Sequence, residues 1–222
     1  MTVILVLATF ALFLLIDYFY SRRRGVVPAW ESEAITPLPR LKPGVVAGFS
    51  LPDNLLYHPG HTWALAESPN LVRVGIDDFG ARLLGSVHRI NMPQRGQWIR
   101  QGQPVFSAYR DGQKVEVLSP IEGMVTDVNA SITREPKAAL NDPYGEGWLL
   151  KVQSPDARTN FRNLLGGVVA RKWMEESAAR LLNRLPALAG AVAQDGGMAV
   201  TDLATQIPEA DWGDLAREFF LN

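Results

Sequence analysis

With 222 residues, the chain is long enough for one mid-sized domain with appendages or for two small domains, but not for a large multidomain enzyme. Its 22 lysines and arginines nearly balance 23 aspartates and glutamates, so no overall basic field attracts nucleic acid. The absence of cysteine excludes disulfides, zinc-thiolate sites, iron–sulfur clusters and thiol nucleophiles.

The first 24 residues have the pattern of a membrane anchor. Residues 2–20 carry only one ionisable group before their aromatic end, Asp17, and at about 1.5 Å per residue they span roughly the hydrocarbon core of a bilayer. Aromatic residues at 18–20 match an interfacial belt, and the arginines at 22–24 indicate the cytoplasmic side. A cleaved signal peptide would need a cationic start and small residues at a cleavage site. We therefore predict a single-pass helix in the inner (cytoplasmic) membrane, with the C-terminal part of the chain in the cytoplasm.

Residues 25–52 have the composition of a spacer. They contain five prolines and few apolar runs, which disfavours both helix and sheet and favours an extended chain. This pattern predicts a tether over residues 25–52 that holds the following domain near the membrane.

Residues 53–155 have the pattern of an all-β domain. Short β-branched or aromatic runs alternate with Gly, Pro, Asn and Asp. One short helix is expected over Asp77 to Leu84, and Asp111-Gly112 predicts a two-residue hairpin turn, because both of its central residues need positive φ. The expected strands cover Thr62 to Ala66, Val72 to Ile76, Ser86 to Ile90, Pro104 to Tyr109, Lys114 to Leu118, Gly123 to Val128 and Trp148 to Val152.

Residues 156–222 are predicted to form a helical extension. One apolar stripe at helical spacing is expected to end before Pro186, and a second begins after Pro208. The first stripe consists of Met174, Ala178, Leu181, Leu182 and Leu185, and the second of Trp212, Leu215, Ala216, Phe219 and Phe220. The apolar end of the chain is expected either to pack on its own domain or to dock into a partner, so Trp212, Phe219 and Phe220 are candidate partner-binding residues.

Over roughly residues 50–153, several motifs occur together, in the order and spacing of a known family. The most specific is Asn141-Asp142-Pro143-Tyr144-Gly145-Glu146-Gly147-Trp148-Leu149. The others are Leu55-Leu56-Tyr57 with His61-Thr62-Trp63, Val74-Gly75-Ile76-Asp77-Asp78-Phe79 with Leu84-Gly85, the turns at Pro93, Gly96 and Gly102, and Ser119-Pro120 with Gly123 and Val128-Asn129. Together they resemble the H protein of the glycine cleavage system. The resemblance implies a lipoyl-carrier-type β-sandwich or flattened barrel, so the fold class is mainly β with an N-terminal transmembrane helix and a C-terminal helical extension.

The resemblance fails at the residue that would carry the lipoyl group. Counting back without a gap from Ser119-Pro120, the lipoyl lysine of the family falls on Gly112, and the glutamate of its motif falls on Tyr109. Glycine has no amine to acylate. Lys114 could serve only if the hairpin changed register, because a shift of two residues moves a side chain by about 7 Å along the strand.

Two other sequence features have residue types found in metal or anion sites. His58 and His61 are three residues apart, but a closed metal site needs three or four ligands, and only His88 remains, so packing or surface histidines are expected and no metal. The loop from Tyr144 to Trp148 lacks the lysine and the following helix of a phosphate-binding loop. It is expected to be a structural turn.

The clustered charged residues have the pattern of solvated surface groups. Asp142 and Glu146 flank that turn and are expected to be solvated rather than catalytic. Arg171, Lys172 and Arg180 alternate with glutamates, which indicates a solvated helix face. No nucleophile, base and orienting group occur together, so the chain is not expected to be an enzyme.

These observations lead to two functional hypotheses. The first is a membrane-anchored, non-lipoylated H-protein-like module that acts as a binding or structural accessory subunit of a membrane complex, with protein partners, no cofactor and no nucleic acid. The alternative is a working lipoyl carrier that uses Lys114 and shuttles intermediates for a glycine cleavage or related redox system.

Overall fold

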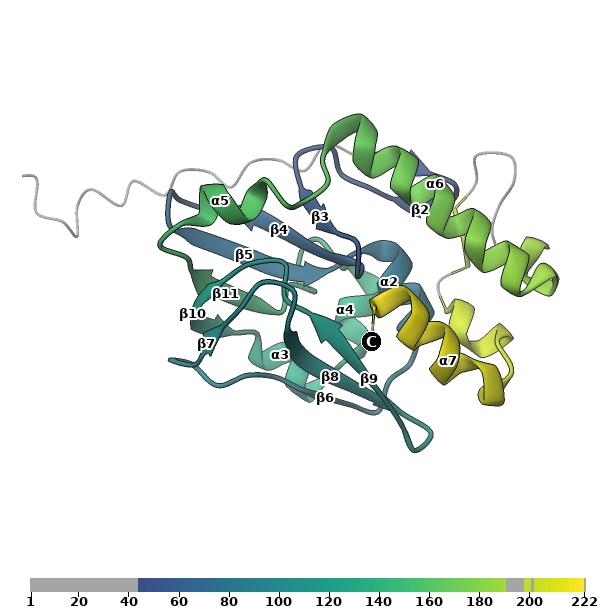
Figure 1. Ribbon diagram of the computed structural model, residues 1–222. Helices are drawn as coiled ribbons and strands as arrows, with labels where there is room; N and C mark the ends of the chain where they lie inside the picture. Colours follow the sequence, from purple (N-terminus) through teal and green to yellow (C-terminus); the bar gives the residue numbers. More distant parts are fainter. Residues whose placement is uncertain (1–43, 191–197, 201, 222) are drawn as a thin grey trace, which may run out of the picture. The chain divides into compact units, whose positions relative to one another are not determined.

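A computed structural model of the chain describes residues 44–190, 198–200 and 202–221 (Figure 1). These residues belong to one compact unit, Leu41–Asn222. The predicted membrane helix over residues 1–24 and most of the predicted tether lie outside the described residues. Within the described part of the chain, no helix has both the length and the apolar character needed to cross a membrane.

Two larger antiparallel sheets form the β part of the unit. The six-stranded sheet has the order β3-β4-β5-β11-β10-β7, and the three-stranded sheet has the order β6-β8-β9. The first consists of β3 (Leu56–His58), β4 (Thr62–Ala66), β5 (Leu71–Ile76), β11 (Leu150–Gln153), β10 (Gly123–Val128) and β7 (Trp98–Ile99). The second consists of β6 (Arg89–Asn91), β8 (Pro104–Arg110) and β9 (Gln113–Leu118).

The mainly β fold predicted from the sequence is confirmed. Five of the seven expected strands match within one residue at each end, and the helix expected at Asp77 to Leu84 is α2 (Asp78–Leu84), with Asp77 as its N-cap. The expected strands at 86–90 and 148–152 begin three and two residues later. Two further short helices, α3 (Ala130–Arg134) and α4 (Lys137–Asn141), connect β10 to the Asn141 to Leu149 motif.

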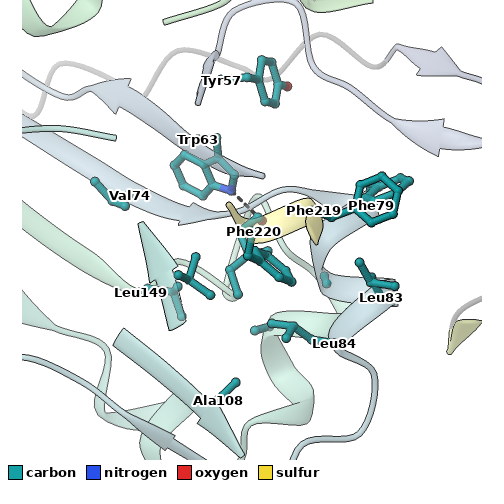
Figure 2. Packing of buried hydrophobic residues seen from close by; sticks show 14 of the residues in the cluster. Tyr57, Trp63, Val74, Phe79, Leu83, Leu84, Ala108, Leu149, Phe219 and Phe220 are labelled. Carbon is teal, nitrogen blue, oxygen red and sulfur yellow. Dashed lines mark hydrogen bonds between the residues drawn. The ribbon is translucent and has the colours of Figure 1, made fainter. Parts of the chain in front are cut away.

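Trp63 sets the register of the central strands. It is fully buried (Figure 2), and it pairs with Gly75 on the neighbouring strand. A Cβ atom at Gly75 would lie 2.5 Å from the Trp63 ring, so glycine leaves the space that the indole fills. The indole Nε1 donates hydrogen bonds to the carbonyls of Ile76 (2.9 Å) and Pro143 (3.1 Å), which connects the strands to the Asn141 to Leu149 motif.

The tether was predicted to extend to residue 52, and this boundary is wrong. Residues 45–50 form a small hairpin of β1 (Val45–Val46) and β2 (Phe49–Ser50), whose turn at Ala47 and Gly48 has positive φ at both positions. Phe49 is fully buried, so an apolar anchor overrides the low sheet propensity of the surrounding prolines.

Two tyrosines hold this hairpin on the domain. The Tyr57 hydroxyl donates to the carbonyl of Pro52 at 2.8 Å, and the Tyr144 hydroxyl donates to the carbonyl of Ser50 at 2.6 Å. The Asp78 carboxylate accepts a hydrogen bond from the Ser50 backbone at 2.7 Å. The segment from 44 to 52 therefore belongs to the folded unit.

The helices of the C-terminal extension pack on the same core. They are α5 (Ala157–Phe161), α6 (Gly167–Arg184), the 3-10 helices η1 (Pro186–Gly190) and η2 (Leu203–Gln206), and α7 (Glu209–Phe220). Both predicted apolar stripes face inward: Met174, Ala178 and Leu181 of the first are buried, and all five residues of the second are buried. As predicted, α6 ends before Pro186, and Pro208 is the N-cap of α7.

The three residues considered for partner binding are core residues, which corrects their interpretation as a docking surface. Trp212, Phe219 and Phe220 are at most 1% exposed. The Trp212 indole donates a hydrogen bond to the carbonyl of Leu83 at 2.8 Å, and the Phe219 ring lies 5.1 Å from the Phe79 ring between centroids (Figure 2). Side chains without exposed surface have none to offer a partner, so the apolar end of the chain packs on its own domain.

Because α7 is part of the core, truncating its buried end should destabilise the whole unit. We expect Phe220→Ala to lower the free energy of unfolding by about 3–5 kcal/mol, through lost burial and the cavity left behind. Denaturant titration of the detergent-solubilised full chain, followed by tryptophan fluorescence, measures this change. The neighbouring Leu221→Ala is the matched control, because Leu221 is 49% exposed and should change the same quantity by less than about 1 kcal/mol. Equal effects of the two substitutions would contradict the placement of α7.

Candidate functional site: the β8–β9 hairpin

The hairpin formed by β8 and β9 carries the position that the sequence singles out. Tyr109 pairs with Lys114 and Arg110 with Gln113, which leaves Asp111 and Gly112 as the two turn residues. Their φ values of 48° and 81° fit the tight turn that the Asp-Gly pair predicts. An added Cβ at Gly112 would have no atom within 4 Å, so the apex is open and offers only backbone and the Asp111 carboxylate.

Lys114 lies on the strand and not at the apex. Its side chain is 47% exposed, and its amine lies 2.5 Å from Glu116 Oε1, two residues further along the same face. The hydrogen bond to Glu116 raises the pKa of the Lys114 amine above its usual value. An exposed lysine is protonated at neutral pH with or without this ion pair, so the main effect of Glu116 is to hold the amine against the strand.

The base of the turn is held by the C-terminal extension. The Arg110 guanidinium donates a hydrogen bond to the carbonyl of Ala204 in η2 at 3.1 Å, and its Cζ lies 5.4 Å from the centre of the Trp212 ring. Only 16% of the Arg110 side chain is exposed. One strand end is thus fixed against two elements that lie about ninety to a hundred residues later in the chain.

The opposite strand end is held by α7 itself. Gln113 Nε2 donates to the carbonyl of Glu209 at 2.8 Å. A Cβ at Gly213 would lie 1.7 Å from Gln113 Oε1, so a glycine within α7 allows the helix to approach the hairpin closely. Sequence reasoning did not identify Arg110 or Gln113. The one available signal was this glycine inside an amphipathic helix, where glycine costs stability unless packing requires it.

Comparison with known proteins identifies the family that has this framework. The profile of the family described as Glycine cleavage H-protein matches residues 55–177, more than half of the chain. The chain belongs to the glycine cleavage H-protein family.

Individual relatives cover the same region. The glycine cleavage system H protein of Rubrobacter xylanophilus is 36% identical over 103 residues, which are 46% of this chain and 81% of that protein. The probable glycine cleavage system H protein 2 of Saccharolobus solfataricus is 29% identical over 138 residues, 61% of this chain and 93% of that protein. A crystal structure of the H protein from Mycobacterium marinum aligns with a TM-score of 0.48 and 23% identity, over 57% of this chain and 98% of that chain.

The matched region ends within α6, so η2 and α7 lie outside it. The contacts of Ala204, Glu209 and Trp212 with the hairpin therefore come from a part of this chain that the family match does not include.

The histidines considered as metal ligands have structural roles in this H-family chain. His61 is fully buried, and its Nδ1 lies 2.9 Å from Asp77 Oδ2. Its ring stacks on Phe79 at 4.3 Å between centroids and lies 4.7 Å from the Trp173 ring. His58 Nδ1 accepts a hydrogen bond from the Gly60 backbone at 3.0 Å. In the described ranges, no three His, Cys, Asp or Glu side chains are placed to hold a metal ion.

The other charged candidates are also engaged locally. Asp142 accepts hydrogen bonds from the backbone of Gly145 (3.0 Å) and of Glu146 (2.9 Å), so its carboxylate caps a structural turn. His88 lies beside the hairpin apex, 3.4 Å from the Asp111 carboxylate. Neither arrangement brings a nucleophile together with a base.

The contacts of Arg110 predict that it matters more to the hairpin than Lys114 does. We expect Arg110→Ala to lower the free energy of unfolding by about 1–3 kcal/mol and to speed hydrogen exchange of the hairpin amides, because the hydrogen bond to Ala204 and the packing on Trp212 are lost. Hydrogen-exchange mass spectrometry of the full chain measures the second effect. Lys114→Ala, on the same hairpin, should change neither quantity appreciably, since exposed ion pairs contribute little.

The environment of His58 predicts a pH dependence of stability. Burial, and secondarily the proximity of His61, lowers the pKa of His58 in the folded state below its ordinary value of about 6.5. The unfolded chain then binds more protons, so stability falls as the pH drops below that value and levels off below the folded-state pKa. Denaturant titrations between about pH 7 and about pH 5 should show a smaller loss for His58→Gln than for the unaltered chain. His88→Gln removes an exposed histidine and is the control. If the free energy of unfolding changes with pH by the same amount in all three proteins, His58 is not the cause of the pH dependence.

Proposed function

We propose that this chain is a non-lipoylated H-type module that serves as a binding or structural accessory subunit of a membrane complex. Its domain lies in the cytoplasm and is anchored to the inner membrane by a single helix. It performs no catalysis and needs no cofactor. The observation that carries this proposal is the chemistry of the hairpin apex.

The apex offers no amino group. Counting back from Ser119-Pro120 assigns the lipoyl-lysine position to Gly112, and this residue is at the tip of the β8–β9 turn. A lipoyl group needs an amine for its amide bond, and the nearest lysine along the chain, Lys114, lies two residues down the strand in an ion pair with Glu116. A carrier arm attached there would start about 7 Å from the tip.

The contacts of the extension support the same conclusion. A carrier hairpin has to present its tip to several partner enzymes in turn. Here Arg110 and Gln113, which flank the turn, are bonded to η2 and α7, so one side of the hairpin is occupied by the protein itself. This arrangement suits a fixed scaffold better than a shuttle.

The membrane location is supported by the sequence alone. Residues 2–20 have the length and the apolar character of a bilayer-spanning helix, and the three arginines that follow favour a cytoplasmic domain. A binding module held at the membrane in this way is suited to an accessory role in a larger assembly.

The alternative function is a lipoyl carrier that uses Lys114. Membership of the H-protein family favours it, and so does the partial exposure of the Lys114 side chain. The two functions differ in one measurable property, the mass of the native chain.

Intact-mass measurement of the chain purified from its native membranes tests the proposal. We expect the unmodified mass, and the same result after growth with added lipoate. An H protein with a lysine at its hairpin apex, expressed and measured in parallel, is the positive control for lipoylation. A lipoyl adduct that disappears in Lys114→Arg would refute the proposal and establish the alternative. The same preparation in mild detergent should retain partner subunits, and a lone monomer would count against the accessory role.

A further inference from the structure

Among the exposed apolar residues of the described structure, which also include the cross-strand pair Trp98 and Met124, one group lies near the start of α6. It consists of Val168 (82% exposed) and Val169 (61% exposed) in the first turn of α6, and Val45 (48% exposed) on β1. We call these three residues the valine face. Elsewhere, the exposed side of α6 carries charged residues such as Lys172, Glu175, Glu176 and Arg180, so two adjacent exposed valines interrupt a polar surface.

The valine face lies where the described chain begins. A Cβ at Gly44, the first described residue, would lie 3.7 Å from an Arg171 guanidinium nitrogen. Arg171 is three residues after Val168 and therefore lies on the same side of the helix. In addition, α6 contacts β1, and α6 runs along one side of the folded unit in Figure 1. Gly44, the first described residue, therefore lies beside the first half of α6, which begins with Val168 and Val169.

Exposed cations lie near the valine face, and two of them form ion pairs with acidic side chains. Arg162 and Lys172 are exposed within a few residues of the valines. Arg171 pairs with Asp53 at 2.7 Å, and Lys172 pairs with Glu175 at 3.7 Å. All four of these side chains are at least 40% exposed. Exposed pairs are held weakly, so both cations can also reach the phosphates of a lipid surface.

A small apolar surface is sufficient because the domain is tethered. Burial of a valine side chain contributes at most about 1.5–3 kcal/mol, too little to hold a freely diffusing protein on a membrane. A short tether keeps the domain at a high effective concentration near its membrane, so a weak contact becomes populated. In this chain only residues 25–43 separate the predicted anchor from Gly44.

We propose that the valine face rests on the surface of the phospholipid bilayer that holds the anchor, with Arg162, Arg171 and Lys172 at the headgroups. This inference rests on the membrane anchor of the proposed function and adds the orientation of the domain. The β8–β9 hairpin, on a different part of the unit, is then left accessible from the cytoplasm.

The absence of cysteine from the chain permits a direct test. A single cysteine introduced as Val169→Cys is labelled with an environment-sensitive fluorophore, and the full chain is reconstituted in vesicles of phosphatidylcholine and phosphatidylglycerol. Met124→Cys is the matched control, since Met124 is a 41% exposed apolar residue on β10. It pairs with Trp98 of β7 near one end of the six-stranded sheet, whereas α6 follows Leu165, which pairs with Tyr57 at the opposite end. Val168→Cys provides a second position in case the first variant folds poorly.

We expect the label at 169 to show blue-shifted emission and to lose intensity when the vesicles contain spin-labelled lipid, while the label at 124 does neither. If the chain floats with the vesicles but both labels emit as in water, the inference is wrong and the anchor stands. A blue shift at 169 without quenching by lipid would mean that a protein surface, such as a second copy, covers the valines, and it would also overturn the proposal. A chain that does not float with the vesicles would refute the anchor and the inference together.

Discussion

The packing of His61 is the constraint on which the rest of the structure depends. His61 has a left-handed backbone conformation (φ 58°), and its carbonyl accepts a hydrogen bond from the Asp77 backbone at 3.0 Å. The Asp77 carboxylate lies 2.9 Å from His61 Nδ1 and also caps α2 through the Gly80 backbone. The His61 ring contacts Phe79 of α2 and Trp173 of α6, and its centroid lies about 6 Å from that of Phe219 of α7. One buried imidazole thus joins the β domain to both long helices of the extension.

This shared core has a consequence at the hairpin. Because Phe219 and Phe220 are buried beside His61, the direction of α7 is set, and its first half lies against β9. Glu209 and Trp212 then meet Gln113 and Arg110 at the base of the turn. The extension is therefore part of the environment of the site, and it reaches that site only because its other end is fixed in the core.

Family membership and function are separate questions for this chain. The framework that resembles the family, from Trp63 to the Asn141 to Leu149 motif, is explained by packing and hydrogen bonding that any use of the fold would need. The chemistry of a carrier depends instead on one side chain at one turn. At that turn Gly112 satisfies the backbone requirement for positive φ and supplies no reactive group, which is the physical basis for proposing a scaffold.

The sequence by itself determined the family, most of the strands, the Asp111-Gly112 turn and both apolar helix stripes, because these follow from local patterns: alternation, turn chemistry and helical spacing. It could not show that the segment around Phe49 joins the fold, since five prolines in residues 25–52 outweigh one apolar anchor in any local reading. Nor could it decide whether Trp212, Phe219 and Phe220 face a partner or the core, because a stripe looks the same in both cases. The contacts of Arg110 with Ala204 and of Gln113 with Glu209 join residues more than ninety positions apart. Only the tertiary packing around His61 brings them together, since no local pattern encodes a contact between distant segments.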